Sequence, residues 1–282
     1  MSTPKQKIQL AFSPCPNDTF MFDAMIHGKI DTEGLEFNVE LHDIETLNKK
    51  ALQSVFDVSK ISFFAFTSVA EQYQLLTSGS ALGTNCGPLL ISKKEIKLSD
   101  LKNKIIAIPG KNTTAHFLLN TAFPEVLHKK EMIFSAIEQA VLTEIVDAGV
   151  IIHENRFTYQ DKGLLKLLDL GEYWEKTTGL PIPLGGIAVR RSLPLDLKQK
   201  INRIMRESVL YALSHPSEVS DFIKMNAQEM DEDVIQQHIN LYVNSYSVDL
   251  GEKGKQAVYR MFESYFEHKK ILLNTSQLFI DE

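Results

Sequence analysis

Short apolar runs recur along this chain and alternate with longer segments in which apolar residues have helical spacing. The runs are rich in β-branched and aromatic residues and end at turn-forming residues, as strands do. They cover residues 8–12, 35–41, 105–108, 150–152 and 186–189. The alternation predicts an α/β protein with largely parallel sheets.

Between these runs, the spacing of apolar residues predicts a series of helices. In the first half of the chain they cover 19–28, 43–53, a stretch beginning near Thr114, and 135–147. The segment 58–66 has the pattern of a strand that runs directly into a helix. The last third is mostly helical, with helices expected over 195–214, 216–225, 231–242 and 252–268.

The order of these elements predicts two lobes. The strand pattern restarts after Ser99, and a segment rich in proline and glycine, 181–186, has the composition of a crossover back to the first lobe. We expect residues 1–88 plus 190–282 to form a larger α/β lobe with a helical C-terminal part, and 89–189 to form a smaller α/β lobe. This organisation resembles the type II periplasmic binding-protein architecture, in which the ligand lies in a cleft between the lobes.

Composition narrows the class of partner. The chain has 282 residues, of which 44% are hydrophobic and 23% charged, and its net charge is -6. A chain with no basic excess is not expected to bind nucleic acid, so a small-molecule ligand is favoured. The N-terminal apolar run is too short for a signal peptide, and no run approaches the ~20 residues of a membrane span. We therefore expect a cytoplasmic protein with no membrane partner. In that compartment Cys15 and Cys86 are expected to be reduced thiols. Oligomeric state is left open.

The stretch SPCPNDTF, residues 13–20, follows the first predicted strand directly. Its prolines stiffen the chain and its Asn and Asp favour a turn, and turns at strand ends are where α/β proteins hold ligands. Ser13, Asn17 and Asp18 are therefore candidate ligand-binding residues. The alternative is an ordinary helix start, capped by Asn17 or Asp18 near Thr19.

His153 follows the apolar run at 150–152 and is expected at the carboxyl end of a buried strand. An imidazole titrates near neutral pH, so His153 is a candidate base. The three residues that follow it, 154–156, could fix its tautomer or hold an anion. The alternative is a histidine that only ends a strand and hydrogen-bonds to a neighbouring loop.

The stretch PGKNTTAH, residues 109–116, follows another strand and opens a helix. Free amides at a helix N-terminus favour a carboxylate or phosphate, and Thr113 and Thr114 could add hydroxyl donors, or one could simply cap the helix. Lys60, Ile61, Ser62 and Phe63 lie where a further strand ends. The glycines of the segment 83–88 could allow close approach to a ligand or form a hinge.

Several common sites are not predicted. The chain lacks the G-x-x-x-x-G-K-[ST] spacing of a nucleotide-binding loop, the H-E-x-x-H spacing of a zinc site and the G-x-S-x-G turn of a serine hydrolase. We expect no metal and no cofactor.

Six segments together resemble the family of 1,4-dihydroxy-6-naphthoate synthases, which act in the futalosine route to menaquinone. They are SPCPNDTF (13–20), DIETLN (43–48), the K-x-S-F segment from Lys60, GSALGTNCGPLL (79–90), IPGKNTTA (108–115) and GVIIHENRFTY (149–159). They occur in order over most of the first 190 residues, whereas the C-terminal third is less diagnostic.

The resemblance implies a carbon-carbon lyase that converts cyclic dehypoxanthinyl futalosine, a small carboxylate, into 1,4-dihydroxy-6-naphthoate and dihydroxyacetone. It implies that His153 is the proton acceptor. Substrate-binding positions map onto Ile61, Ser62 and Phe63 and onto Thr113 and Thr114. Ser13, Asn17 and Asp18 belong to the family signature, and Lys60 to the K-x-S-F segment.

Three other readings compete with this one. A chorismate dehydratase of the same pathway would share the fold but perform an elimination, and the SPCPNDTF and I-I-H-E segments favour the synthase over it. A solute-binding protein would release its ligand unchanged and would need an export signal. The effector domain of a transcription regulator would need a helix-turn-helix segment.

Overall fold

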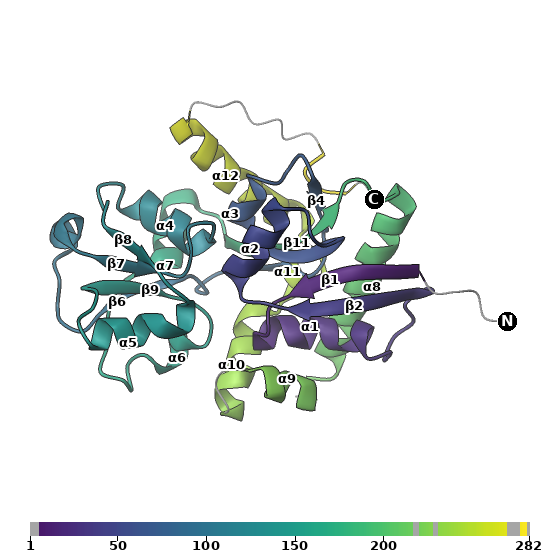
Figure 1. Cartoon of the computed structure of the whole chain (residues 1–282), viewed down its shortest axis with the longest axis horizontal. Coiled ribbons are helices and arrows are strands. Elements are labelled where there is room, and N and C mark those ends of the chain that lie inside the picture. Colours follow the sequence, from purple (N-terminus) through teal and green to yellow (C-terminus); the bar gives the residue numbers. More distant parts are fainter. Residues whose placement is uncertain (1–5, 217–219, 228–230, 270–276, 281–282) are drawn as a thin grey trace.

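Two β-sheets, each flanked by helices, lie side by side in the computed structural model of the chain (Figure 1). The structure describes residues 6–216, 220–227, 231–269 and 277–280. The first sheet lies with α1, α8, α9 and α10, and the second with α4, α5, α6 and α7 (Figure 1). The α/β class and the two-lobed architecture predicted from the sequence are confirmed.

The first sheet has the strand order β2-β1-β3-β11-β4, with β5 also pairing with β11. Its strands are β1 (Gln6–Phe12), β2 (Leu35–Leu41), β3 (Val58–Ser62), β4 (Tyr73–Leu75), β5 (Ala81–Gly83) and β11 (Ile182–Arg190). β1 pairs in parallel with β2 and β3, whereas β11 runs antiparallel to β3, β4 and β5.

The second sheet has the order β10-β6-β9-β7-β8. Its strands are β6 (Leu89–Ser92), β7 (Ile106–Ile108), β8 (Lys129–Glu131), β9 (Ala148–Ile151) and β10 (Leu165–Asp169). β7 is parallel to β8 and β9, but β6 is antiparallel to β9 and β10. The expectation of largely parallel sheets was therefore wrong. Parallel neighbours need a crossover connection, and β6 and β11 instead enter their sheets directly as the chain passes from one lobe to the other.

The helices mostly begin and end where the apolar spacing predicted. They are α1 (Pro16–Ile26), α2 (Ile44–Leu52), α3 (Phe63–Phe66), α4 (Thr114–Ala122), α5 (Ile137–Leu142), α6 (Asn155–Thr158), α7 (Leu170–Thr178), α8 (Leu195–Ser214), α9 (Asp221–Asn226), α10 (Glu232–Tyr242), α11 (Ser245–Val248) and α12 (Gly251–Lys269), with 3₁₀ turns at Leu98–Asn103 and Phe134–Ala136.

Three predicted helices have different bounds. The helix expected over 135–147 ends at Leu142, because the chain turns at Glu144, whose φ is 57°. The helix expected over 216–225 begins at Asp221, and part of the predicted range lies outside the described residues. α1 begins at Pro16, earlier than expected, because proline fits the first helical position, where no backbone donor is needed.

The pairing of β11 with β3 bears on the division into lobes. β11 joins β3 from Gly185 to Val189 and so belongs to the first sheet. The boundaries 1–88 plus 190–282 and 89–189 stay a prediction, and we propose that the chain returns to the first lobe before Ile182.

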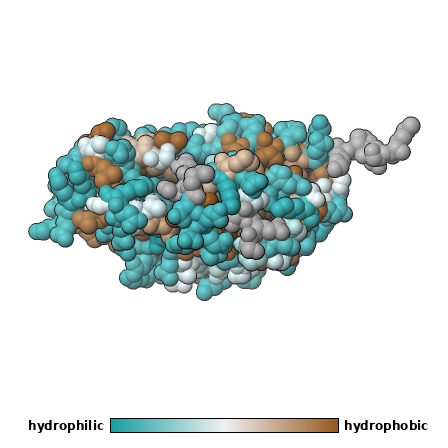
Figure 2. Space-filling view, turned by 90° about the horizontal axis from the view of Figure 1, so that it is seen from below, coloured by the Kyte–Doolittle hydropathy of each residue, from teal (hydrophilic) through white to brown (hydrophobic). Residues whose placement is uncertain are grey.

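The surface seen in Figure 2 is mostly hydrophilic. On the face shown in Figure 2, hydrophilic residues cover both lobes and apolar residues are scattered among them. Within the described ranges, no helix is both long and apolar enough to cross a membrane.

Gly87, near the crossing into β6, packs against the backbone of Gly171 at the start of α7. A Cβ atom added at Gly87 would lie 2.3 Å from the Gly171 Cα, so backbone would have to move. Overpacking of this kind costs about 1–3 kcal/mol, and we expect Gly87→Ala to lower the free energy of unfolding by that amount in urea titrations. The control is Gly83→Ala in the same segment, where the nearest atoms are side-chain atoms at 3.3 Å. Equal stability of the two variants would contradict the close approach.

Candidate active site

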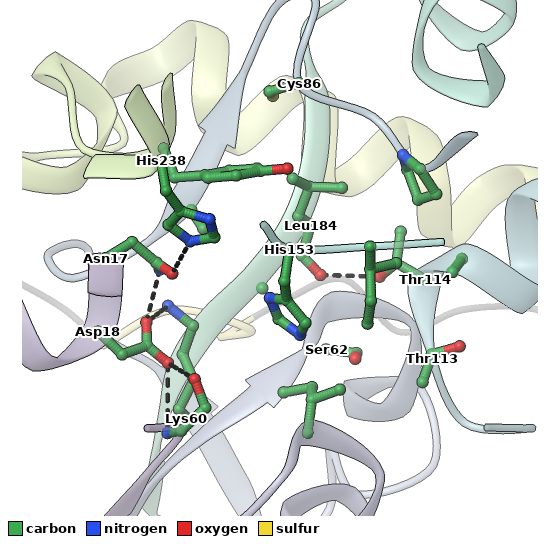
Figure 3. Close-up of a pocket in the computed structure, with 18 residues that line it drawn as sticks. Asn17, Asp18, Lys60, Ser62, Cys86, Thr113, Thr114, His153, Leu184 and His238 are labelled. Carbon is green, nitrogen blue, oxygen red and sulfur yellow. Dashed lines mark hydrogen bonds and ion pairs between the residues drawn. The ribbon is translucent and has the colours of Figure 1, made fainter. Parts of the chain in front are cut away.

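A cavity that opens to solvent lies between the two lobes, and residues of both lobes line it; its empty space, the open part included, is about 640 Å³. The first lobe supplies the turn after β1, the end of β3, part of β11 and one face of α10, and the second supplies the start of α4 and the residue pair after β9 (Figure 3). The lining residues are Ser13, Asn17, Asp18, Ile44, Lys60, Ser62, Ala81, Cys86, Pro88, Thr113, Thr114, Ala115, Ile152, His153, Leu184, Gly185, His238 and Tyr242.

Most of the side chains singled out from the sequence are brought together here. Those that line the cavity are Ser13, Asn17, Asp18, Lys60, Ser62, Thr113, Thr114 and His153. Ile61 and Phe63 are not among the lining residues, because both are fully buried in the core. Side chains alternate along a strand, so Lys60 and Ser62 face the cavity while Ile61 faces the other side of β3. The side chains of Ile61 and Phe63 therefore do not face the cavity, and the role of these two residues in substrate binding stays a prediction.

A charged pair anchors the turn after β1. The Lys60 Nζ lies 2.7 Å from Asp18 Oδ1, and both side chains are almost fully buried. Asp18 Oδ2 accepts a hydrogen bond of 2.7 Å from the Ser13 hydroxyl, and Oδ1 accepts one of 2.8 Å from Asn17 Nδ2. Asp18 therefore does not cap a helix. It joins the turn after β1, in the SPCPNDTF segment, to β3 (Figure 3).

His153 extends from the segment after β9 into the cavity wall (Figure 3). Its φ is 60°, a left-handed conformation that is uncommon for residues other than glycine, although Asn, Asp and His adopt it more often than the rest. Its Nδ1 lies 3.3 Å from the Cys15 Sγ, and its Nε2 is buried with no hydrogen-bond partner among the described residues. Burial raises the pKa of the Cys15 thiol, so this contact is with a neutral SH group. When Nδ1–H donates to that sulfur, the Nε2 lone pair is free to accept a proton.

The environment of His153 keeps the ring neutral. Burial lowers its pKa to about 4, Asp18 and Asp43 oppose this shift, and Lys60 adds to it. The sequence-based expectation of a group that titrates near neutral pH was therefore wrong, because desolvation disfavours the charged imidazolium. At pH 7 the neutral imidazole can act as a general base, but it is not the imidazolium that a general acid would require.

Asn155 and Arg156 do not fix the tautomer of His153, contrary to one reading of the sequence. Arg156 donates to the carbonyl oxygens of Gly87 and Asn85 and forms a 2.7 Å ion pair with Asp169. Asn155 donates to Glu138. The contact to His153 Nδ1 comes instead from Cys15, so Arg156 serves to hold the 83–88 segment against the second lobe.

The start of α4 presents donors to the cavity. Thr113 caps the helix by accepting from His116 N and donates its own proton to Gly110 O, and the Thr114 hydroxyl donates to Leu184 O. Both hydroxyl protons are thus already used. The backbone N–H groups of Thr114 and Ala115 donate to no acceptor in the described part of the chain, so these amides are the available donors for an anion.

The DIETLN segment holds this loop in place. Asn48, fully buried on α2, donates to the Ser62 hydroxyl and to Asn112 O, and accepts from Ser62 N. Glu45 accepts hydrogen bonds from the backbone and side chain of Asn112. β3 and the α4 loop therefore keep a fixed separation across the cavity.

The residues of the wall that the reasoning from sequence missed include two on α10. His238 and Tyr242 lie one turn apart on α10, and their rings are 4.6 Å apart. The ring of His238 lies 6.2 Å from that of His153 with an interplanar angle of 28°. Their spacing fits any amphipathic helix, so no signal in the sequence separates them from core residues.

One group of side chains beside the cavity, of which only His153 lines it, has ligand types that zinc accepts. Cys15, His153 and Glu154 place one ligand atom each within 4.8 Å of one another. Burial raises the pKa of the Cys15 thiol and keeps it protonated, so a metal bound here would have to displace that proton.

Comparisons with known proteins place this chain among biosynthetic enzymes. The model of a family described as menaquinone biosynthesis matches residues 8–267. A 1,4-dihydroxy-6-naphthoate synthase of Thermus thermophilus is 42% identical over 257 residues, covering 91% of this chain and 93% of the relative. One of Streptomyces coelicolor is 42% identical over 256 residues, covering 89% and 90%.

Solved structures show the same fold. A protein from Archaeoglobus fulgidus superposes with a TM-score of 0.88 at 38% identity, covering 94% of this chain and 98% of that one. The alkanesulfonate-binding protein of Xanthomonas axonopodis pv. citri, bound to MOPS, has a TM-score of 0.71 at 11% identity and covers 98% of each chain. The second likeness concerns the periplasmic binding-protein fold alone.

Proposed function

Because this chain belongs to the menaquinone biosynthesis family and to its 1,4-dihydroxy-6-naphthoate synthases, which are lyases, we propose that it converts cyclic dehypoxanthinyl futalosine to 1,4-dihydroxy-6-naphthoate and dihydroxyacetone. The observation that carries this proposal is a neutral imidazole, His153, in the wall of a cavity between two lobes. The relatives' names favour this reaction over that of a chorismate dehydratase.

We propose that His153 Nε2 accepts the proton next to the substrate ketone. The electron pair left behind forms an enolate. The hydroxyl group on the ring carbon that carries the sugar-derived fragment then loses its proton and becomes a carbonyl as the carbon-carbon bond breaks. The electron pair of that bond leaves with the fragment as a second enolate, which takes up the proton to give dihydroxyacetone, and the ring tautomerises to the aromatic diol. General-base help contributes roughly 10²–10⁴-fold. Hydrogen-bond donors that stabilise the enolate and orientation in the cavity must supply the remainder.

The substrate carboxylate is the natural partner of the α4 amides. The N–H groups of Thr114 and Ala115 have no acceptor among the described residues, and the helix dipole favours an anion at this end. We propose that this end of the cavity binds the ring carboxylate. Lys60, Asn17 and Asp18 lie on the other side of the cavity (Figure 3), where we propose that the sugar-derived fragment binds. The Ser13 hydroxyl, bonded to Asp18, lies there too.

The test is direct. Purified protein is incubated with cyclic dehypoxanthinyl futalosine, and the naphthoate is followed by its ultraviolet absorbance while dihydroxyacetone is measured enzymatically. We expect the two products in equal amounts. A rise in melting temperature with no product would instead indicate a binding protein.

The pH profile of the reaction is a second prediction. The pKa of His153 is lowered to about 4, so the imidazole stays neutral, and able to accept a proton, down to that pH. We expect kcat/KM to be constant between pH 8 and about pH 5 as far as the base is concerned, whereas a histidine titrating near 6.5 would lose most of its neutral form over that range. Initial rates in buffers of constant ionic strength check this. A midpoint near pH 6.5 would contradict the desolvated base.

A further inference from the structure

His238 has the features of a ligand-binding group that the proposed chemistry does not yet use. It is fully buried on α10, lines the cavity and lies against the ring of His153 (Figure 3). Its Nε2 lies 2.8 Å from Asn17 Oδ1. Its Nδ1 is buried and has no hydrogen-bond partner among the described residues. A buried polar atom without a partner is rare in folded proteins and calls for an explanation.

The surrounding hydrogen bonds determine which nitrogen of His238 carries the proton. Asn17 Nδ2 donates to Asp18 Oδ1 at 2.8 Å, so it is the amide oxygen of Asn17 that faces His238. An amide oxygen only accepts, and therefore His238 Nε2 must be the donor. In a neutral ring Nδ1 is then an acceptor.

The charged pair makes this arrangement rigid. Asp18 is held by Lys60 at 2.7 Å and by the Ser13 hydroxyl at 2.7 Å, so its carboxylate cannot turn away from Asn17. Burial lowers the pKa of His238 well below its ordinary value, and His153 adds to the effect. The ring stays neutral at pH 7, and Nδ1 keeps its lone pair available.

We propose that His238 Nδ1 accepts a hydrogen bond from a hydroxyl group of the substrate, and that the Asn17–Asp18 turn serves to present it as an acceptor. The ligand chemistry that fits is a polyol, because a bare imidazole nitrogen requires a donor and rejects a carboxylate. This rests on the proposed function, in which the sugar-derived fragment carries the hydroxyl groups. His238 is thus a substrate-binding residue, and Asn17 and Asp18 are positioning residues.

Two substitutions separate this role from a structural one. In His238→Gln, the side-chain amide can still donate to Asn17 from the position of Nε2, but no acceptor remains at the position of Nδ1. In His238→Asn, the amide oxygen can occupy the position of Nδ1, but the bond to Asn17 is lost. We expect His238→Gln to weaken substrate binding about tenfold, the effect of one hydrogen bond, and His238→Asn to retain more of it. If His238 only fills space and holds Asn17, the order is reversed.

Dissociation constants are measured by calorimetry with cyclic dehypoxanthinyl futalosine in a His153→Asn background, where turnover is reduced and the left-handed backbone is tolerated. KM and kcat are measured in the otherwise unchanged protein. Weaker binding by the Gln variant with kcat changed less than KM supports the proposal. Equal affinities, or the reversed order, overturn it. A wild-type protein that binds the compound without converting it contradicts the proposed function, while the order of the dissociation constants still decides the role of His238.

Discussion

Replacing His153 is expected to reduce turnover by roughly 10²–10⁴-fold while substrate affinity changes little. The reason is that Nε2 is the proposed proton acceptor, whereas the α4 amides and the polar side chains around Asp18 are proposed to bind the substrate. We suggest His153→Asn as the principal variant, because asparagine tolerates the left-handed backbone of this position better than alanine does. A loss of activity in this variant then reports on the base rather than on a strained turn.

The measurement combines kcat from naphthoate formation with the dissociation constant from calorimetry. His128→Ala is the matched control, since His128 is exposed and does not line the cavity, and it is expected to keep wild-type turnover. If His153→Asn retained more than a tenth of the wild-type kcat, the base would have to be another group of the wall.

Much of the site could be predicted from the sequence because its residues follow strands. A polar residue directly after an apolar run emerges at a strand end, and strand ends meet at one edge of a sheet. This argument found Lys60, Thr113, Thr114 and His153, and the structure brings all four to the cavity. The same argument does not distinguish alternate residues within a strand, and so it included Ile61, whose side chain faces the core.

The remaining features depend on contacts between distant parts of the chain. His238 meets Asn17 only because α10 packs against α1 in the folded protein, and nothing local marks it. The low pKa of His153 comes from burial by residues of both lobes. The antiparallel strands β6 and β11 result from the path of the chain between lobes rather than from their own composition.

The second large effect concerns stability. Lys60→Met is expected to lower the free energy of unfolding by about 3–5 kcal/mol, because it leaves the buried carboxylate of Asp18 without its counter-charge. The side chains of Lys60 and Asp18 are 5% and 2% exposed. Lys176→Met is the control: the Lys176–Glu172 pair has the same 2.7 Å separation, but its side chains are 72% and 49% exposed. Exposed pairs contribute about 0–1 kcal/mol, so this control should unfold at nearly the wild-type urea concentration.

The double variant Lys60→Met/Asp18→Asn separates loss of the pair from an unpaired charge. Removing both charges should recover part of the stability lost in Lys60→Met, since no charge is then buried alone. Recovery will be incomplete, because Asp18 accepts from three donors besides Lys60, on Ser13 and Asn17, and an amide group cannot accept from all of them. If Lys60→Met and Lys176→Met were equally stable in urea titrations, burial would not set the strength of this ion pair. The Asn17–Asp18 turn would then need another explanation for its fixed position beside His238.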